Sequence, residues 1–120
     1  MDIRDRIKTF EDAQAATGRT ETPDFSIFPE DMQEHFEALY KMYVIIEALN
    51  EGWKPNWDND GRKYYPWFYM VTGEFTWFGT KYGLHSAVGG HGSRLQLKSP
   101  ELVEYAVTQF KDIWKKIQLK

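Results

Sequence analysis

The hydrophobic pattern is clearest over residues 29–51, where apolar side chains recur at three- and four-residue steps and predict one long helix. Its apolar positions are Met32, Phe36, Leu39, Tyr40, Tyr43, Val44, Ile45, Ile46 and Leu49. A stripe this wide indicates that the helix is buried on more than one side. Pro29 suits the first helical position, and Glu30 and Asp31 complement the positive end of the helix. Gly52 and Pro55 end it.

Two further helices have recognisable starts. Thr9 is a typical N-cap residue, and Asp12, three residues later, can accept hydrogen bonds from free backbone N–H groups. A short helix follows and ends at Gly18. Ser99 and Pro100 form the second start. One apolar stripe follows it, made of Leu102, Val103, Ala106, Val107, Phe110, Ile113, Trp114 and Ile117. This stripe predicts a single final helix whose apolar face packs in the core.

Residues 19–28 connect the first two predicted helices. Threonine, serine, aspartate and proline are frequent among them, which is typical of a loop. Phe25, Ile27 and Phe28 are the apolar exceptions, and we expect them to pin this loop to the core.

Two aromatic and β-prone segments, residues 62–71 and 74–79, predict strands. Thr72-Gly73 between them marks a turn, so the two strands are expected to form a hairpin. Residues 79–92 contain five glycines and predict a long loop.

A third strand is expected over residues 93–98. Leu95 and Leu97 alternate there with polar residues, which is typical of a half-exposed strand. The element order is then α-α-β-β-β-α. The predicted fold class is α+β, a three-stranded antiparallel meander with three helices packed mainly on one face.

The length of 120 residues, without any linker-like segment, predicts a single domain over residues 1–120. The chain contains no cysteine, which excludes disulfides and thiolate metal ligands and fits a reducing compartment. Its charged start lacks the apolar core of a signal peptide, and no apolar run reaches the length of a membrane span. We therefore expect a cytoplasmic protein with no membrane partner.

The net charge of −3 is distributed unevenly. Residues 1–51 carry twelve acidic and five basic side chains, whereas residues 52–120 carry six acidic and ten basic ones. The folded molecule is expected to be electrically two-sided. Its overall acidity argues against a protein that coats nucleic acid through charge alone, because phosphate binding needs a surplus of lysine and arginine.

Eleven of the twenty aromatic residues lie between residues 53 and 82. Aromatics occupy both odd and even positions of the predicted first strand, so alternation alone cannot bury all of them on one face. Packing in the core and in cross-strand ladders is the common role of such residues. The other interpretation is that one row is exposed and binds a partner.

The leading hypothesis is a non-enzymatic binding or accessory protein that contacts an unknown protein partner through this aromatic surface. The candidate binding residues are Trp53, Trp57, Tyr65, Trp67, Tyr69 and Arg94. The alternative is a single-stranded nucleic-acid-binding protein, in which the strand aromatics stack on bases beside Arg62, Lys63, Arg94 and Lys98. The acidic long helix repels phosphate, so we expect nucleic-acid binding to be weak.

Each candidate motif for catalysis or metal binding lacks a residue or an element that its chemistry requires. Asn56, Asp58, Asp60 and Gly61 match the start of a calcium-binding loop, but Trp67 occupies the twelfth position, which requires a carboxylate. Residues 89–94 are glycine-rich, but a strand rather than the helix of a phosphate loop is expected after them. A small hydrolase or transferase using His85 and His91 is the last-ranked hypothesis. The sequence predicts no enzyme, no cofactor and no metal site.

Seven short stretches spread over most of the chain carry a resemblance to a known group of proteins. Two of them are distinctive, the segment ALNEGWKP at residues 48–55 and the segment KYYPWF at residues 63–68. The others are at residues 9–13, 29–31, 93–95, 98–99 and 101–106. The chain resembles an uncharacterised family of small proteins encoded by phages, prophages and genomes of gut Bacteroidetes. The resemblance implies an origin in a mobile element and a location in bacterial cytoplasm, and it assigns no functional residue.

Overall fold

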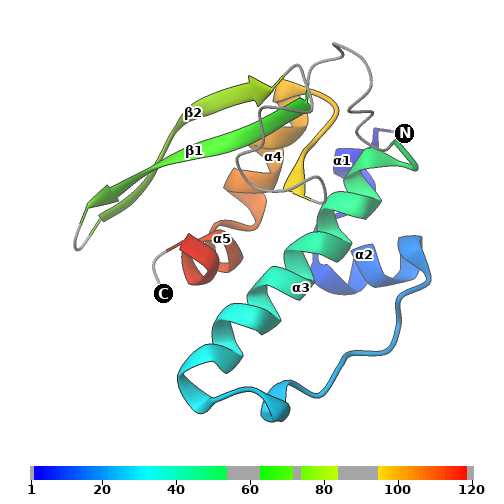
Figure 1. The fold of residues 1–120 in the computed structure, drawn as a ribbon. Helices are drawn as coiled ribbons and strands as arrows, with labels where there is room; N and C mark the ends of the chain where they lie inside the picture. The colour runs from blue at the N-terminus through cyan, green and yellow to red at the C-terminus, as the bar shows by residue number, and fades with distance from the viewer. Residues whose placement is uncertain (1, 54–62, 72–73, 84–94, 119–120) are drawn as a thin grey trace.

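The computed structural model describes residues 2–53, 63–71, 74–83 and 95–118, and within the two strands it describes the side chains of Tyr64 and Pro66 alone. The elements in chain order are α1 (Ile3–Arg6), α2 (Phe10–Thr17), the 3-10 turn η1 (Phe25–Ile27), α3 (Glu30–Asn50), β1 (Lys63–Val71), β2 (Glu74–Gly83), α4 (Pro100–Gln109) and α5 (Lys111–Gln118). This part of the chain is mainly helical (Figure 1).

The helix α3 is the centre of the molecule. The helices α2 and α5 pack against it, and α4 joins α5 to the hairpin formed by β1 and β2 (Figure 1). Buried residues from all five helices and from the segment before α4 form one hydrophobic core, which includes Ile3, Ile7, Ala13, Met42, Ile45, Leu49, Leu95, Leu97, Val103, Ala106 and Trp114. Within the described residues, no helix is long and apolar enough to cross a bilayer.

The long helix matches its prediction. Its C-terminal half is buried on several sides, at Met42, Val44, Ile45, Ile46, Ala48, Leu49 and Asn50. The helix ends because Glu51 adopts the left-handed conformation with a φ of 50°, and Gly52 follows with a φ of 91°. At its N-terminal end Met32 is exposed, so the apolar stripe continues beyond the core.

Capping hydrogen bonds stabilise the two N-terminal helices, α1 and α2. The Thr9 side chain accepts a hydrogen bond from the Asp12 backbone N–H, while the Asp12 carboxylate accepts one from the Thr9 N–H. This capping box and the left-handed Gly18, with a φ of 75°, confirm the predicted short helix. The four-residue α1 was not predicted, although the Asp2 side chain caps it and Ile3 anchors it in the core.

The predicted α+β fold, a three-stranded meander, is wrong. The strands form only a two-stranded antiparallel hairpin, and residues 95–98 contribute a 3-10 position and one isolated bridge between Leu97 and Tyr64. Leu95, Gln96 and Leu97 are all buried, whereas a half-exposed strand would leave the middle residue in solvent. The Gln96 carbonyl and the Lys98 N–H, on the side of the segment away from β1, are hydrogen-bonded to the side chain of Asn50.

The predicted single C-terminal helix is also interrupted. At Phe110 the backbone leaves helical geometry, with a φ of −119° and a ψ of 34°, and α5 begins at the next residue. Neither proline nor glycine is present at this point of the chain. Phe110 and Trp114 are both buried, and Trp114 is 0% exposed, as its place in the apolar stripe predicted.

Candidate functional site

The structure describes the predicted aromatic site in part. Trp57 and Arg94 lie outside the described residues, as does Arg62. Tyr65, Trp67 and Tyr69 lie in β1, where their backbone positions are described and their side chains are not. Trp53 is half-buried directly after α3. The described part of the site therefore consists of the hairpin backbone and the residues that hold its base.

The hairpin register brings defined residues opposite one another. Tyr65 pairs with Lys81 and Trp67 with Gly79, and the register then shifts so that Phe68 pairs with Trp77. One residue of β2 is thus extra, which is a β-bulge; bulges increase the local twist and often lie where a strand redirects side chains. The two strands together contain nine aromatic residues. The predicted hairpin is confirmed, and β2 is longer than predicted.

The base of the hairpin is fixed by the segment before α4. The Tyr64 N–H donates to the Leu97 carbonyl at 3.0 Å, and the Leu97 N–H donates to the Tyr64 carbonyl at 2.8 Å. Tyr64 also packs against the hydrophobic core, and Pro66 is buried. These contacts attach the first residues of β1 to the helical body.

Asn50 completes this attachment from the opposite side. Its Nδ2 donates to the Gln96 carbonyl at 2.9 Å, and its Oδ1 accepts from the Lys98 N–H at 3.1 Å. The asparagine is 5% exposed, and a buried amide of this kind is stable only when it is hydrogen-bonded. Sequence reasoning missed Asn50, although a polar residue one turn after Ile46 in a buried stripe was an available signal.

Trp53 and Lys98 lie beside this clamp. The backbone N–H of Trp53 donates to the backbone carbonyl of Asn50 at 2.9 Å, which holds Trp53 close to the end of α3. The Lys98 Nζ lies 3.4 Å from a carboxylate oxygen of Glu51. Lys63, another predicted cation, is the first residue of β1, where its backbone is described and its side chain is not. Lys98 already has an acidic neighbour.

The rest of the hairpin extends away from the helices. Its main helix contacts are with α4, and the C-terminal end of β1 and the start of β2 point away from the helical body (Figure 1). Within the described residues, no strand lies on the outer side of β2. Open strand edges can pair with an extended segment of another chain. An aromatic hairpin of this form is chemically suited to binding a macromolecule.

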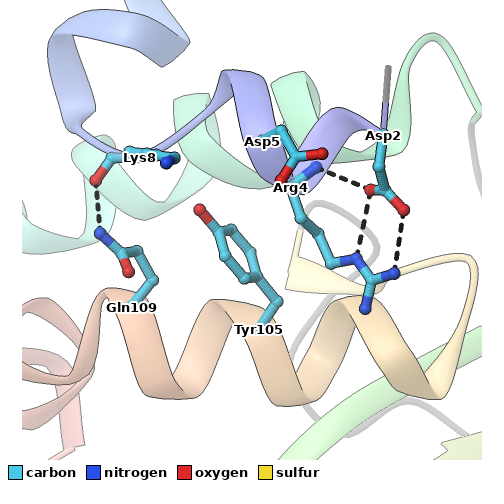
Figure 2. Close-up of a pocket in the computed structure, with 6 residues that line it drawn as sticks. All are labelled: Asp2, Arg4, Asp5, Lys8, Tyr105 and Gln109. Atoms are coloured by element: carbon cyan, nitrogen blue, oxygen red, sulfur yellow. Dashed lines mark hydrogen bonds and ion pairs between the residues drawn. The ribbon is translucent and has the colours of Figure 1, made fainter.

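A polar hollow of about 460 Å³ lies between α1 and α4, lined by Asp2, Arg4, Asp5, Lys8, Tyr105 and Gln109. Figure 2 shows Arg4 folded along Asp2, and the side chains of Tyr105 and Gln109 directed from α4 toward the chain between α1 and α2. The Tyr105 hydroxyl donates to the Ile7 carbonyl, and the Gln109 amide donates to the Lys8 carbonyl at 2.8 Å. Much of the polar lining therefore holds the N-terminal segment in place.

The electrostatics of the hollow agree with that structural role. Side-chain and backbone hydrogen bonds from Arg4 lower the pKa of Asp2 to about 2. Burial raises the pKa of Tyr105 above its ordinary value of 10.0. The lining contains no serine, threonine, cysteine or histidine, so it offers none of the usual nucleophile and base pairs.

The motif residues considered for metal binding lie outside the described residues, among them the segment 56–61, His85 and His91. Among the residues that the structure describes, no three acidic or histidine side chains are grouped to hold a metal ion. Comparison of the chain with models of protein families, with curated proteins and with solved structures found no match.

Proposed function

We propose that this protein is a non-enzymatic binding protein and that its β1–β2 hairpin contacts a protein partner. The observation that carries the proposal is an aromatic-rich hairpin whose base is fixed to the helical body while its far end extends from it (Figure 1). Tryptophan and tyrosine supply much of the binding energy at protein interfaces. A hairpin held at one end presents them on a defined backbone.

The energetics of small sheets support a partner for this hairpin. An isolated two-stranded hairpin is at best marginally stable in water, and further strands or a packed helix are needed to stabilise it. Here α4 covers the hairpin, and Leu97 extends it by a single bridge. An extended segment of a partner that paired with β2 would add a strand and bury further aromatic area.

Charge favours a protein partner over single-stranded nucleic acid. The nucleic-acid alternative needs Lys98 as one of four cations, but Glu51 lies 3.4 Å from its ammonium group. The acidic residues of α3 also repel phosphate. Salt screens this repulsion beyond a Debye length of about 8 Å under physiological conditions. The resemblance of the chain to phage and prophage proteins fits an accessory role in a bacterial cell.

Site-specific photo-crosslinking tests the proposal. The experiment is done in cells whose genome encodes this protein. A photoreactive phenylalanine analogue replaces Tyr65 or Tyr69 of β1. The matched control carries the same analogue in place of Glu104, which is exposed on α4. We expect the hairpin positions, and not the control, to form an adduct with one particular protein.

The adduct must depend on the hairpin aromatics. When the analogue at Tyr69 is combined with Trp67→Ala, we expect the adduct to be lost. When the salt concentration is raised to about 0.5 M, we expect the adduct to persist, since an apolar interface is insensitive to screening. An adduct that nuclease removes would support the nucleic-acid alternative instead. Equal labelling from Glu104 and the hairpin, or no adduct from either strand position, would contradict the proposal.

A further inference from the structure

The two edges of the hairpin differ in the main-chain groups that they present. In an antiparallel pair of strands, opposite residues alternate between pairs whose N–H and C=O groups bond to each other and pairs whose groups point away from the partner strand. The N–H and the carbonyl of Tyr64 both bond to Leu97, on the side of β1 away from β2. Tyr64 and its partner Tyr82 in β2 are therefore a pair of the second kind.

Pro66 supports this assignment independently. It lies two residues after Tyr64 and opposite Thr80, so the alternation makes it another residue whose main-chain groups point away from β2. Proline has no N–H, and within a sheet it occurs where the ladder requires no bond from it. The proline of β1 therefore lies at a position where the pairing with β2 loses nothing.

The outer edge of β1 is closed to a further strand. At its base Leu97 occupies this edge, and the Asn50 side chain holds the residues on both sides of Leu97. A ladder that continued from Leu97 along β1 would pair Leu95 with Pro66, which has no N–H to donate. Proline on an edge strand is one of the features that prevent pairing with another chain.

The outer edge of β2 has no such block. Thr80 and Tyr82 lie opposite the two β1 residues just described, so their N–H and carbonyl groups point away from β1 and into the space beyond β2. Within the part of the chain that the structure describes, the sheet has two strands and nothing pairs with these groups. They are donors and acceptors arranged for an added strand.

The same edge continues past the bulge. The extra residue, Phe78, belongs to β2, so the alternation along β1 is unbroken. The partners of Phe68 and Met70 are Trp77 and Phe75, whose main-chain groups consequently also point away from β1. The open edge thus consists of two short stretches, residues 75–77 and 80–82. The first lies in the part of β2 that extends from the helical body (Figure 1).

We propose that the outer edge of β2, and not that of β1, binds an extended segment of the partner protein as an added strand. The inference rests on the proposed function, because it assigns a main-chain mode of binding to the partner of the hairpin. The segment is an unpaired strand whose N–H and carbonyl groups complement those of Thr80 and Tyr82 and of residues 75–77. In this mode main-chain hydrogen bonds supply the affinity, and side chains add the specificity.

A second copy of this chain fits the edge less well than a different protein does. A two-fold pairing of β2 with itself along its whole edge would bring the bulges of both copies together at its centre. The ladder is interrupted at each bulge, so the two interruptions would coincide. A strand of another protein is under no such symmetry and can pair with either stretch.

Residue-resolved amide exchange of the full chain alone tests the geometry of the edge. We expect the amides of Thr80 and Tyr82 to exchange at least about tenfold faster, relative to their intrinsic rates, than those of Thr76 and Lys81, which face β1. Protection of Thr80 and Tyr82 would show that the edge is already covered. Exchange of Thr76 and Lys81 without protection would show that β2 is not held in this register. Either result would overturn the inference.

Proline variants then test which edge binds. Thr80→Pro removes an outward N–H of β2, and Met70→Pro makes the same change on the outer edge of β1; neither removes a bond between the strands. The readout is the affinity for the protein captured by the crosslink at Tyr65 or Tyr69. We expect Thr80→Pro to weaken binding at least about tenfold, and Met70→Pro to leave it within about threefold.

A backbone variant makes the test independent of the folding of the proline variant. Replacement of Thr80 by the matching α-hydroxy acid removes the same N–H, keeps the side chain and places no restraint on φ. We expect this chain to bind the captured protein about threefold more weakly or less tightly still, as the loss of one hydrogen bond implies.

The outcomes separate this inference from the proposed function. If the captured protein binds the α-hydroxy acid variant as tightly as the parent chain, strand addition at β2 is excluded and the proposed function stands. Equal weakening by Thr80→Pro and Met70→Pro would also overturn the inference, since the two edges would then be equivalent. Capture of no protein through the hairpin would remove both. If the chain alone dimerises at micromolar concentration and Thr80→Pro makes it monomeric, the occupant is a second copy and the choice of partner is wrong.

Discussion

The side-chain amide of Asn50 donates a hydrogen bond to the backbone carbonyl of Gln96 at 2.9 Å, across 46 residues of sequence. With the bond that Asn50 accepts from the Lys98 N–H, it holds an extended segment between the end of α3 and the start of β1. Together with the bridge between Leu97 and Tyr64 on the other side of the segment, this relationship attaches the base of the hairpin to the helical body.

Asn50→Ala should therefore destabilise the protein by about 2–4 kcal/mol, because it leaves a buried carbonyl and a partly buried N–H without their partners. Thermal or denaturant unfolding gives the free energy directly. Glu104→Ala, at an exposed position on α4, is the control and should change it by less than about 0.5 kcal/mol. Amide hydrogen exchange at Tyr64 and Leu97 should also accelerate in the variant. A loss no larger than that of the control would show that the clamp has no stabilising role.

Trp114→Ala should cost about 3–5 kcal/mol, as expected when a large aromatic side chain is removed from a core. Trp114 is 0% exposed and packs where α5 meets α3. Denaturant unfolding of this variant is compared with Lys115→Ala, which removes an exposed side chain from the next position. Equal unfolding midpoints for the two variants would contradict the packing of Trp114 in the core.

The capping box of α2 predicts a dependence of stability on pH. Hydrogen bonds from the backbone N–H of Lys8 and from Thr9 hold the pKa of Asp12 below its ordinary value of 3.8. A carboxyl group whose pKa is lowered by folding contributes stability above its unfolded pKa and loses it as pH falls through the folded pKa.

Asp12→Asn should accordingly be less stable than the parent chain at neutral pH, and the gap should close as the pH falls below about 4. Unfolding curves at a series of pH values measure this. Glu11→Gln makes the same change of charge on the same helix without removing a cap, and should show a smaller gap at pH 7. A gap that widened on acidification would have the wrong sign for this mechanism.

Local interactions explain the parts of the fold that the sequence predicted. The caps at Thr9 and Ser99 involve residues three apart, and the apolar stripe of α3 is continuous, so both are visible in a short window. The hairpin was likewise predicted from adjacent segments. These features do not depend on where the rest of the chain lies.

The errors arise from contacts between distant segments. Alternation of Leu95 and Leu97 fits a half-exposed strand, but Gln96 between them is buried as well, and its carbonyl accepts a hydrogen bond from a side chain 46 residues away, which a short window of sequence does not show. The break at Phe110 has no proline or glycine to signal it, and the apolar stripe continues through it in the sequence. Ile27 is apolar, yet the stack of Phe28 on Phe36 fixes the turn with Ile27 outward.

The candidate site was predicted only in outline. The aromatic segment is a strong sequence signal because it is concentrated in two neighbouring strands. What holds it could not be predicted, since Asn50 and Tyr64 act through backbone atoms of residues 96–98, which carry no side-chain signature.

The central claim, that the hairpin is the surface that binds a protein partner, is tested most directly by hydrogen–deuterium exchange of the full chain with and without the protein captured by the crosslink at Tyr65 or Tyr69. The account predicts that bound partner slows exchange of backbone amides in β1 and β2, and that exchange in the buried half of α3 is unchanged. Slowing confined to the helices, with the amides of both strands unaffected, would contradict it.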